Sequence, residues 1–429
     1  MIRSRLVSDL ALLRHHLATH FLLTRCIEHS ANLAMVVLLT TVASPLRAED
    51  WFRYRGPQLN GRSSETNWSH QWPDAGPNHL WRADVGIGLS AVSVSDGRAY
   101  TLGNTDDTDR VTCLDTKTGA VLWQFGYTAP LDANEFTGGP TSTPTVDGPF
   151  VYTLGRRGEL FCFDKVTGQL SWQIQVAELA KVRTPTWGFS SSPLVSGELL
   201  LLNVGDAGLA VNKHTGALVW SSADRDAGYS SMVPLQVAGK SAVVFGSARS
   251  YVCVTAMTGE ELWRERWLTT FGCNAADPII AGQQIFISSG YNRGCALLEL
   301  VEGKVVQRWK SKEMQNQLSS SLLIDGFLYG IHGDVGSGTE LRCMELSNGT
   351  VQWSSADLQP GGLAAAGQRL IILSDAGELV IAAASPAHSQ ILARHQVLTD
   401  KCWTAPVLSN GKIYCRSMHG ELVCVDVAK

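Results

Sequence analysis

The sequence predicts an all-β chain folded as an eight-bladed β-propeller of four-stranded blades, with the ring closed by an N-terminal strand. Two observations carry this prediction: one weak pattern recurs along the chain, and tryptophans close its copies at a regular spacing. Successive tryptophans are 42, 49, 48, 43, 46 and 44 residues apart and stand at Trp81, Trp123, Trp172, Trp220, Trp263, Trp309 and Trp353. A period of about 40 to 50 residues is typical of propeller blades.

The clearest copy of the pattern spans residues 143–172. It contains an apolar run, a glycine turn, a second apolar run, a third run that ends at Asp164, and a Thr-Gly pair before Trp172. Each copy therefore predicts four short strands. Because a four-stranded sheet cannot bury both faces alone, we expect the copies to stand radially, so that each sheet covers the next.

The two ends of the repeat region are incomplete in a complementary way. The last copy, residues 404–426, stops after three strands, whereas residues 79–85 carry the tryptophan-strand signature without three strands before it. We expect these two segments to pair and close the ring. The seventh copy, residues 361–396, has lost its Thr-Gly pair and its tryptophan. If it were not a blade, the ring would have seven.

The chain divides into an export segment at 1–48, a lead-in at 49–78 and the propeller at 79–429. Residues 33–43 form an apolar run of 11 residues after a stretch that contains Arg14 and Arg25. Such a run is typical of a signal-peptide core and is too short to span a bilayer; a buried helix is the alternative. Because the polar region ahead of it is long, translation starts downstream of Met1 or the export signal is an extended one. We therefore expect a periplasmic or cell-surface protein. Membrane association stays open, although no lipobox cysteine precedes Glu49.

Composition agrees with a globular exported protein. Charged residues make up 17% and hydrophobic residues 45% of the chain, which is enough to bury a large core. The formal net charge is −4. A nucleic-acid partner needs a basic face, so none is expected.

Ten cysteines in an exported chain suggest disulfides, but their positions argue otherwise. Five of them occupy one place in the third strand of different copies: Cys113, Cys162, Cys253, Cys343 and Cys424. Equivalent positions in neighbouring blades are expected to lie too far apart for a disulfide, so we interpret them as small core residues. Pairing is plausible only among Cys273, Cys295, Cys402 and Cys415.

Common catalytic and metal-binding motifs are missing or lack their context. Residues 86–91 match the letters of a dinucleotide fingerprint, but a strand rather than a helix follows them. Residues 104–109 offer oxygens to calcium without the glycine and distal glutamate of a calcium loop, and a solvated acidic turn is the simpler interpretation. No hydrolytic triad, zinc site or other metal site is expected, and no catalytic residue is assigned.

The repeat predicts a mouth at one end of the axis, because the loops that enter the inner strands open on one face together with the loops between second and third strands. Small or polar residues stand at the entrances of the inner strands: Ser90, Ser142, Ser191, Ser231, Asn274, Ser320, Gly362 and Thr404. The need for small residues where strands converge also explains them. The loops around these entrances supply candidates for binding a polar ligand: Asn134, Glu135, Arg183, Trp187, Tyr229, Asn274, Asp277, Asn316, Gln317, Lys401 and Trp403. Packing of Trp187 and Trp403 between blades is the competing interpretation.

The copies around Trp123, Trp172 and Trp220 resemble the pyrroloquinoline-quinone-like (PQQ-like) propeller repeat, over roughly residues 79–429. The lead-in from Trp51 to Gly61 resembles exported proteins of planctomycete-type bacteria that are similar to the outer-membrane assembly lipoprotein BamB. The resemblance implies two functions of different class. One is a non-catalytic binding or assembly scaffold, without a cofactor, that takes a protein or a small polar or polymeric ligand at its mouth. The other is a dehydrogenase that oxidises an alcohol or sugar with PQQ and calcium.

The resemblance favours the scaffold over the enzyme. Quinoprotein dehydrogenases stack the quinone between a tryptophan and a disulfide of adjacent cysteines, and this chain has no Cys-Cys pair or C-x-x-C-H. If the enzyme reading held, Trp187 or Trp403 would stack the quinone and Asn274 with Asp277 would meet the metal. A polysaccharide-binding or other polymer-binding propeller is the third alternative. Because this repeat occurs in enzymes and scaffolds alike, it implies the fold more strongly than the function.

Overall fold

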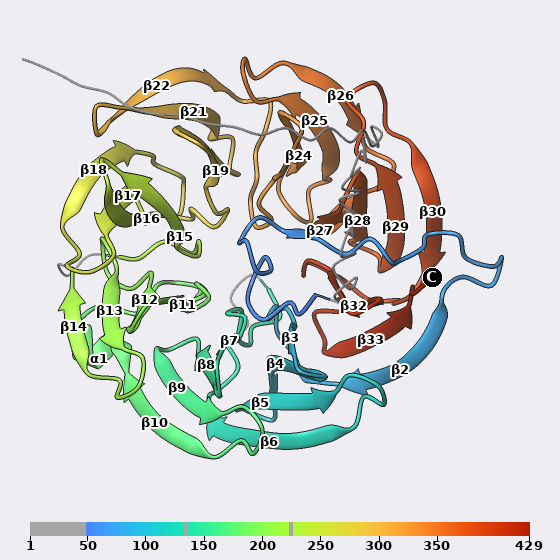
Figure 1. The fold of residues 1–429 in the computed structure, drawn as a ribbon, viewed down its shortest axis with the longest axis horizontal. Coiled ribbons are helices and arrows are strands. Elements are labelled where there is room, and N and C mark those ends of the chain that lie inside the picture. The colour runs from blue at the N-terminus through green and yellow to red at the C-terminus, as the bar shows by residue number, and fades with distance from the viewer. Residues whose placement is uncertain (1–48, 133–135, 223–225) are drawn as a thin grey trace, which may run out of the picture. The chain divides into compact units, whose positions relative to one another are not determined.

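The computed structural model describes residues 49–132, 136–222 and 226–429, and the export segment lies outside this range. Within these residues the strands form eight four-stranded antiparallel units arranged around a central axis, as predicted (Figure 1). The one helix there, α1 (Val176–Ala180), is short, and the described part of the chain contains no helix that is long and apolar enough to cross a membrane.

The first four blades follow one another along the chain. Blade 1 contains β3 (Ser93–Ser95), β4 (Arg98–Thr105), β5 (Thr108–Asp115) and β6 (Val121–Thr128). Blade 2 contains β7 (Thr145–Asp147), β8 (Phe150–Leu154), β9 (Glu159–Asp164) and β10 (Leu170–Gln175). Blade 3 contains β11 (Leu194–Ser196), β12 (Leu199–Leu202), β13 (Leu209–Asn212) and β14 (Leu218–Ser221). Blade 4 contains β15 (Val233–Val237), β16 (Lys240–Gly246), β17 (Ser250–Thr255) and β18 (Glu261–Arg266).

The remaining blades complete the ring. Blade 5 contains β19 (Ile279–Ala281), β20 (Gln284–Ser289), β21 (Gly294–Val301) and β22 (Lys304–Ser311). Blade 6 contains β23 (Leu322–Ile324), β24 (Phe327–His332), β25 (Glu340–Glu345) and β26 (Val351–Ser355). Blade 7 contains β27 (Pro360–Ala366), β28 (Arg369–Ser374), β29 (Glu378–Ala383) and β30 (Ile391–Gln396), so the degenerate seventh copy is a true blade. Blade 8 contains β31 (Val407–Ser409), β32 (Lys412–Arg416), β33 (Glu421–Asp426) and β2 (Asn78–Asp84).

The ring is closed by β2, as predicted. It pairs antiparallel with β33, and Trp81 lies opposite Cys424. The same pairing of a closing tryptophan with a third-strand cysteine recurs at Trp123 and Cys113, and again in blades 2, 4 and 6. A small side chain therefore stands where a large ring crosses the neighbouring strand. All nine cysteines of the described residues are free and buried.

In six of the blades, the closing tryptophan docks onto the following blade through its indole N–H. The indole nitrogen of Trp123 donates to the backbone oxygen of Lys165 in blade 2 at 3.1 Å. A Cβ at Gly168, where φ is +72°, would come within 2.5 Å of the Trp123 ring. The Thr-Gly pair of the repeat thus provides both the left-handed turn and the space for the preceding blade's indole. Trp263 lacks this contact: blade 5 turns tightly at Glu302–Gly303, and the Trp263 indole nitrogen has no hydrogen-bond partner.

The predicted acidic turn near residues 104–109 is a β-hairpin turn. Asp106 and Asp107 adopt positive φ at its tip and are exposed to solvent, whereas Asp109 is buried and accepts a hydrogen bond from Asn104 Nδ2 at 2.7 Å. Burial raises the pKa of Asp109 to about 6. No group of three His, Cys, Asp or Glu side chains within the described ranges could hold a metal ion.

The lead-in crosses the middle of the ring (Figure 1). Its backbone oxygens at Trp51 and Phe52 accept hydrogen bonds from Val94 of blade 1 and Val146 of blade 2. Farther along, β1 (Arg62–Ser63) pairs in parallel with the inner strand of blade 7. The lead-in is therefore a strap that joins the inner strands of blades 1, 2 and 7 through the middle of the ring.

Candidate functional site

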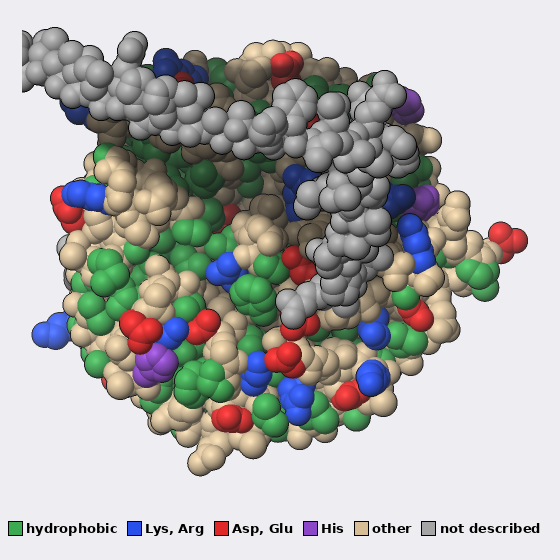
Figure 2. Space-filling model, in the orientation of Figure 1, with side chains coloured by type: hydrophobic (Ala, Val, Ile, Leu, Met, Phe, Trp, Pro, Cys, Tyr) green, Lys and Arg blue, Asp and Glu red, His purple; other side chains and the backbone are tan. Residues whose placement is uncertain are grey.

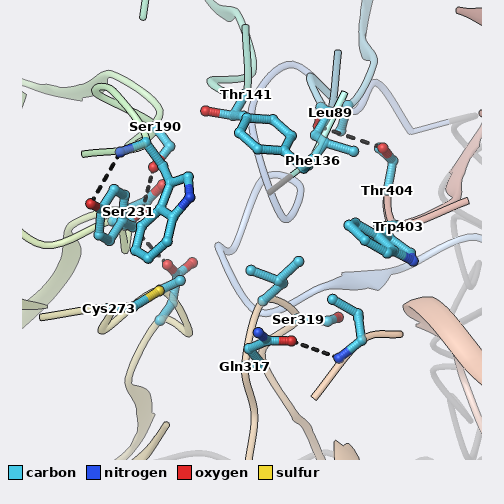
Figure 3. Close-up of a pocket in the computed structure, with 18 of the residues that line it drawn as sticks. Leu89, Phe136, Thr141, Ser190, Ser231, Cys273, Gln317, Ser319, Trp403 and Thr404 are labelled. Carbon is cyan, nitrogen blue, oxygen red and sulfur yellow. Dashed lines mark hydrogen bonds between the residues drawn. The ribbon is translucent and has the colours of Figure 1, made fainter. Parts of the chain in front are cut away.

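A cavity of about 420 Å³ lies on the axis, at the entrances of the inner strands. The lining comes from seven blades, all except blade 7, and from Tyr54 of the lead-in, so the strap forms the inner end of the cavity. Figure 3 shows the arrangement of the walls: Trp403 lies across the cavity from Ser231 and Cys273. The predicted mouth is therefore a pocket with one open end.

A belt of hydrogen bonds runs around the cavity, from blade to neighbouring blade. The backbone N–H of Thr143 donates to Ser192 Oγ at 3.0 Å, and the backbone N–H of Ser192 donates to Ser231 Oγ at 2.9 Å. Further links of the same kind join Ala91 to Thr143, Ser231 to Asp277, and Asp277 to Ser320. The small polar residues at these entrances therefore tie the inner strands together as well as allowing them to converge.

The belt is interrupted at blade 7, where no side-chain oxygen is present. A Cβ at Gly362 would come within 2.3 Å of the backbone oxygen of Thr404, so the inner strand of blade 7 approaches blade 8 backbone to backbone. Glycine is needed at this entrance because a side chain would collide with the backbone of blade 8. Not every entrance residue lines the cavity: Ser90 Oγ and Ser191 Oγ accept hydrogen bonds from the second strands of their own blades, at the backbone of Leu102 and Asn203.

Asp277 is the one acidic member of the belt. Its Oδ1 accepts the backbone N–H of Ser231 at 2.8 Å, and its Oδ2 lies 3.8 Å from Nε of Arg55 in the lead-in. The residue is only 5% exposed. Burial raises the pKa of Asp277 to about 6, against the opposing effects of Arg55 and of the Ser231 hydrogen bond. A carboxylate is thus held at the inner end of the cavity at a cost in desolvation.

Aromatic rings cluster on the side of blades 3 to 5, where Trp187, Tyr229 and Tyr291 line the cavity and Phe271 lines a neighbouring groove. Trp187 lies 5.6 Å from Tyr229 and 5.8 Å from Phe271, centroid to centroid, and Phe271 lies 5.4 Å from Tyr291. The angles of 89° and 79° at Phe271 are edge-to-face contacts, which aromatic pairs favour. Phe271 is 52% exposed at the end of this series. We call Trp187, Tyr229, Phe271 and Tyr291 the aromatic wall.

Five of the predicted candidates line the cavity: Trp187, Tyr229, Asp277, Gln317 and Trp403. Gln317 Nε2 donates to the Tyr291 hydroxyl at 3.0 Å, and its Oε1 accepts the backbone N–H of Val335 at 2.6 Å. The Trp403 indole donates to the carboxylate of Asp375 in blade 7. Trp403 therefore both packs between blades and presents a face to the cavity. The two interpretations of this residue, packing and ligand binding, are compatible.

Other predicted candidates lie elsewhere. Asn274 Nδ2 donates to the backbone oxygens of Ser247 and Trp267, and Asn316 Nδ2 donates to that of Ile331, so both amides are fixed inside the ring wall. Arg183 lines a separate open groove and pairs with Asp226 at 2.9 Å. The Nζ of Lys401 lies 5.5 Å from the Trp403 ring, and Lys401 is exposed and is not part of the lining. Asn134 and Glu135 lie outside the described residues.

The sequence did not single out several lining residues, namely Tyr54, Phe136, Tyr291, Leu318 and Asp334. Tyr291 and Asp334 lie between the second and third strands of blades 5 and 6, where mouth residues were expected. The sequence could have indicated Tyr291 as a mouth residue, because the Gly290-Tyr291-Asn292 turn lies between two apolar strands. Tyr54 had no such signal, since nothing in the repeat places the lead-in on the axis.

The described lining lacks several groups that the resemblance implies for a calcium-bound PQQ. It includes Asp277 and Asp334 but no lysine, arginine or histidine that could pair with the carboxylates of this quinone. Cys273 has no second cysteine in the lining, and burial raises the pKa of its thiol to about 11. The amide of Asn274, which the resemblance assigned to a metal, is used within the ring wall.

Comparison with known proteins supports the fold. A family model described as "Outer membrane protein assembly factor BamB" matches residues 107–355, more than half of the chain. No curated protein matches the sequence. BamB from Moraxella catarrhalis is similar in structure, with a TM-score of 0.61 at 16% identity over 82% of this chain and 99% of that one.

Enzymes and a designed protein share the same architecture. Quinohemoprotein alcohol dehydrogenase from Comamonas testosteroni has a TM-score of 0.60 at 13% identity, over 88% of this chain and 80% of that chain. The computationally designed Ika8 protein has a TM-score of 0.59 at 13% identity, over 82% of this chain and 100% of that one. At such identities the likeness extends to the fold alone.

Proposed function

Because the chain belongs to the family described as outer membrane protein assembly factor BamB, with a PQQ-like propeller fold, we propose that it is a non-catalytic binding propeller of the cell envelope. Its axial mouth takes a segment of a protein partner. The family's description concerns protein assembly at the outer membrane, which supports this role and an exported location.

The axial cavity is the observation that carries this proposal. One wall is aromatic, the belt presents hydroxyls, and the strap closes the inner end. Aromatic faces with a few oriented polar groups are what a binding pocket needs to hold a chain segment. The buried Cys273 thiol, with its raised pKa, makes a poor nucleophile.

The surface visible in Figure 2 shows no large cluster of like charge that could bind a charged polymer. On the part of the face in Figure 2 that is not covered by grey atoms, acidic and basic side chains are interspersed, with apolar side chains between them. No field of one sign stands out in this view, which agrees with the formal net charge of −4.

The test is a selection of random dodecapeptides displayed on phage against the purified protein. Clones that also bind a Trp187→Ala/Trp403→Ala double variant are removed in each round. We expect sequences to be enriched that bind wild type and not the double variant. Circular dichroism of the variant checks that its fold is kept.

Matched titrations address the alternatives. PQQ is titrated with and without calcium, and cellohexaose is titrated as a neutral oligosaccharide, following tryptophan fluorescence and thermal stability. We expect no saturable binding of either at micromolar concentration. Calcium-dependent quinone binding that is lost in the double variant, or saturable binding of the sugar with no peptide enriched, would overturn the proposal.

A further inference from the structure

We propose that the axial cavity recognises a basic side chain, lysine or arginine, carried by the partner segment, with Asp277 as the residue that receives its charge. This inference rests on the proposed function and specifies the ligand of the same site. It starts from the belt, where one position departs from the others.

A hydroxyl is sufficient for the structural role of that position. Thr143, Ser192 and Ser231 each accept the backbone N–H of the preceding blade through a hydroxyl oxygen at 2.9–3.1 Å. Asp277 accepts the same bond at 2.8 Å with a carboxylate oxygen. Because burying a carboxylate costs desolvation that a serine avoids, the acid is better explained by a task that needs its charge.

Arg55 is the cation nearest to Asp277, but the two side chains form an ion pair without a hydrogen bond. Its Nε lies 3.8 Å from Asp277 Oδ2, beyond hydrogen-bond distance. The guanidinium is oriented by backbone oxygens instead: Nη2 donates to Ser321 at 3.0 Å and Nε to Leu59 at 3.3 Å. Asp277 therefore lies near a cation without a direct hydrogen bond to it, and it also contributes to the cavity lining.

The charge of the lining selects against anions. Asp277 and Asp334 belong to it, and the described lining residues include no basic side chain. In a pocket with restricted access to water, two carboxylates with no cation in the lining favour a cationic guest.

The rings add to this preference, because the negative face of an aromatic ring attracts cations. Two rings of the lining already contact cations from outside it: Arg156 lies 5.4 Å from the Phe136 centroid and Lys401 Nζ 5.5 Å from that of Trp403. Arg156 is itself paired with Asp132. A long basic side chain could pack its methylene stem along the aromatic wall and bring its charged end toward Asp277.

The selected peptides test this inference directly. We expect lysine and arginine to be enriched over the input library in the peptides that depend on Trp187 and Trp403. A peptide from this set is then synthesised with its basic residue kept or replaced by norleucine, and its affinity is measured by fluorescence anisotropy. Removing the charge should weaken binding about 10- to 100-fold, the usual range for losing a charged partner.

The matched protein variants are Asp277→Ser and Asp226→Ser. The first gives the belt the side chain that it has at Ser192, Ser231 and Ser320, and the second removes a carboxylate of the neighbouring groove that is not in the lining. We expect the first to lose about 10-fold or more in affinity for the basic peptide and the second less than about 2-fold. If Asp277→Ser does not fold, Asp277→Asn keeps the acceptor for Ser231 and should give the same loss.

Three outcomes would overturn the inference. Neutral or acidic peptides that are enriched and depend on Trp187 and Trp403 would leave the proposed function standing and refute the basic ligand. Equal affinity of Asp277→Ser and wild type for the basic peptide would refute the role of Asp277. No enrichment at all would remove the proposed function together with this inference.

Discussion

The two ends of the axial channel are built on different principles. At the inner end the strap is fixed by buried polar contacts, with Arg55 bound to backbone oxygens and Glu65 Oε2 accepting the backbone N–H of Gly411 at 2.9 Å. At the mouth, side chains meet mainly through ring edges, and Phe271 is left largely exposed. Removing one partner of a buried polar contact lowers the free energy of unfolding, because the other partner stays buried without a hydrogen bond. Replacing an exposed ring changes that free energy little, and such a ring is accessible to a ligand. Changes to the strap should therefore mainly affect stability, and changes to the rings at the mouth should mainly affect binding.

The largest expected effect is at the inner end. Arg55→Met removes the hydrogen bonds to Ser321 and Leu59 and leaves Asp277 without its nearby cation. We expect the free energy of unfolding to fall by about 3 kcal/mol, as for other buried pairs that lose one partner. Urea denaturation followed by tryptophan fluorescence measures it.

A double variant provides the control. Arg55→Met/Asp277→Ser should recover about 1 kcal/mol relative to the sum of the single changes, because the buried charge that the first change leaves behind is gone. A fully additive double variant would show that the two side chains are independent, and the strap would then be held by its backbone contacts alone.

An effect of intermediate size is expected from pH. Burial raises the pKa of Asp277 from 3.8 to about 6, so the native state holds a proton that the unfolded chain releases between these values. This contribution to stability is present below pH 4 and is lost as the pH rises through 6. The groups facing the carboxyl are Arg55, Tyr54 and Tyr251.

Comparing wild type with Asp277→Ser isolates the contribution of Asp277 protonation to the free energy of unfolding. Relative to wild type, the variant should gain on the order of 2 kcal/mol of stability between pH 4 and pH 7, since a pKa unit corresponds to about 1.4 kcal/mol. Denaturation curves at several pH values measure it. A difference that stays constant with pH would mean that Asp277 is ionised in the native state throughout.

The smallest expected effect on stability is at the mouth. Phe271→Ser changes a half-exposed ring at the end of the aromatic wall, so the free energy of unfolding should change by less than about 0.5 kcal/mol. Affinity for a selected peptide should nevertheless fall severalfold, because Phe271 supports Trp187 and Tyr291. A large loss of stability with unchanged affinity would reverse the contrast between the two ends.

The ring could be predicted from the sequence, because its determinants are local and repeated. The tryptophans recur every 42 to 49 residues, four of them after a Thr-Gly pair, and the missing strand of the incomplete last copy was found in residues 79–85. The inner end of the cavity could not be predicted, since Tyr54 and Arg55 meet Asp277 across more than 200 residues with no repeated signal. The mouth was predicted in part. Assigning the loops was enough to predict that Trp187 and Trp403 lie there. The position of Asn274 could not be predicted, because a shift of one residue decides whether its side chain points to the axis or into the ring wall.

The pairing of β2 with β33 has a kinetic consequence. The two strands that close the ring are about 340 residues apart, so blade 8 can form only after nearly all of the chain is available. Until then β2 keeps an unpaired edge beside the exposed indole of Trp81, and such edges are where incomplete chains aggregate. Assembly of this ring is therefore a late, long-range step, and the slow phase of refolding should report the arrival of the last strand rather than the formation of any single blade.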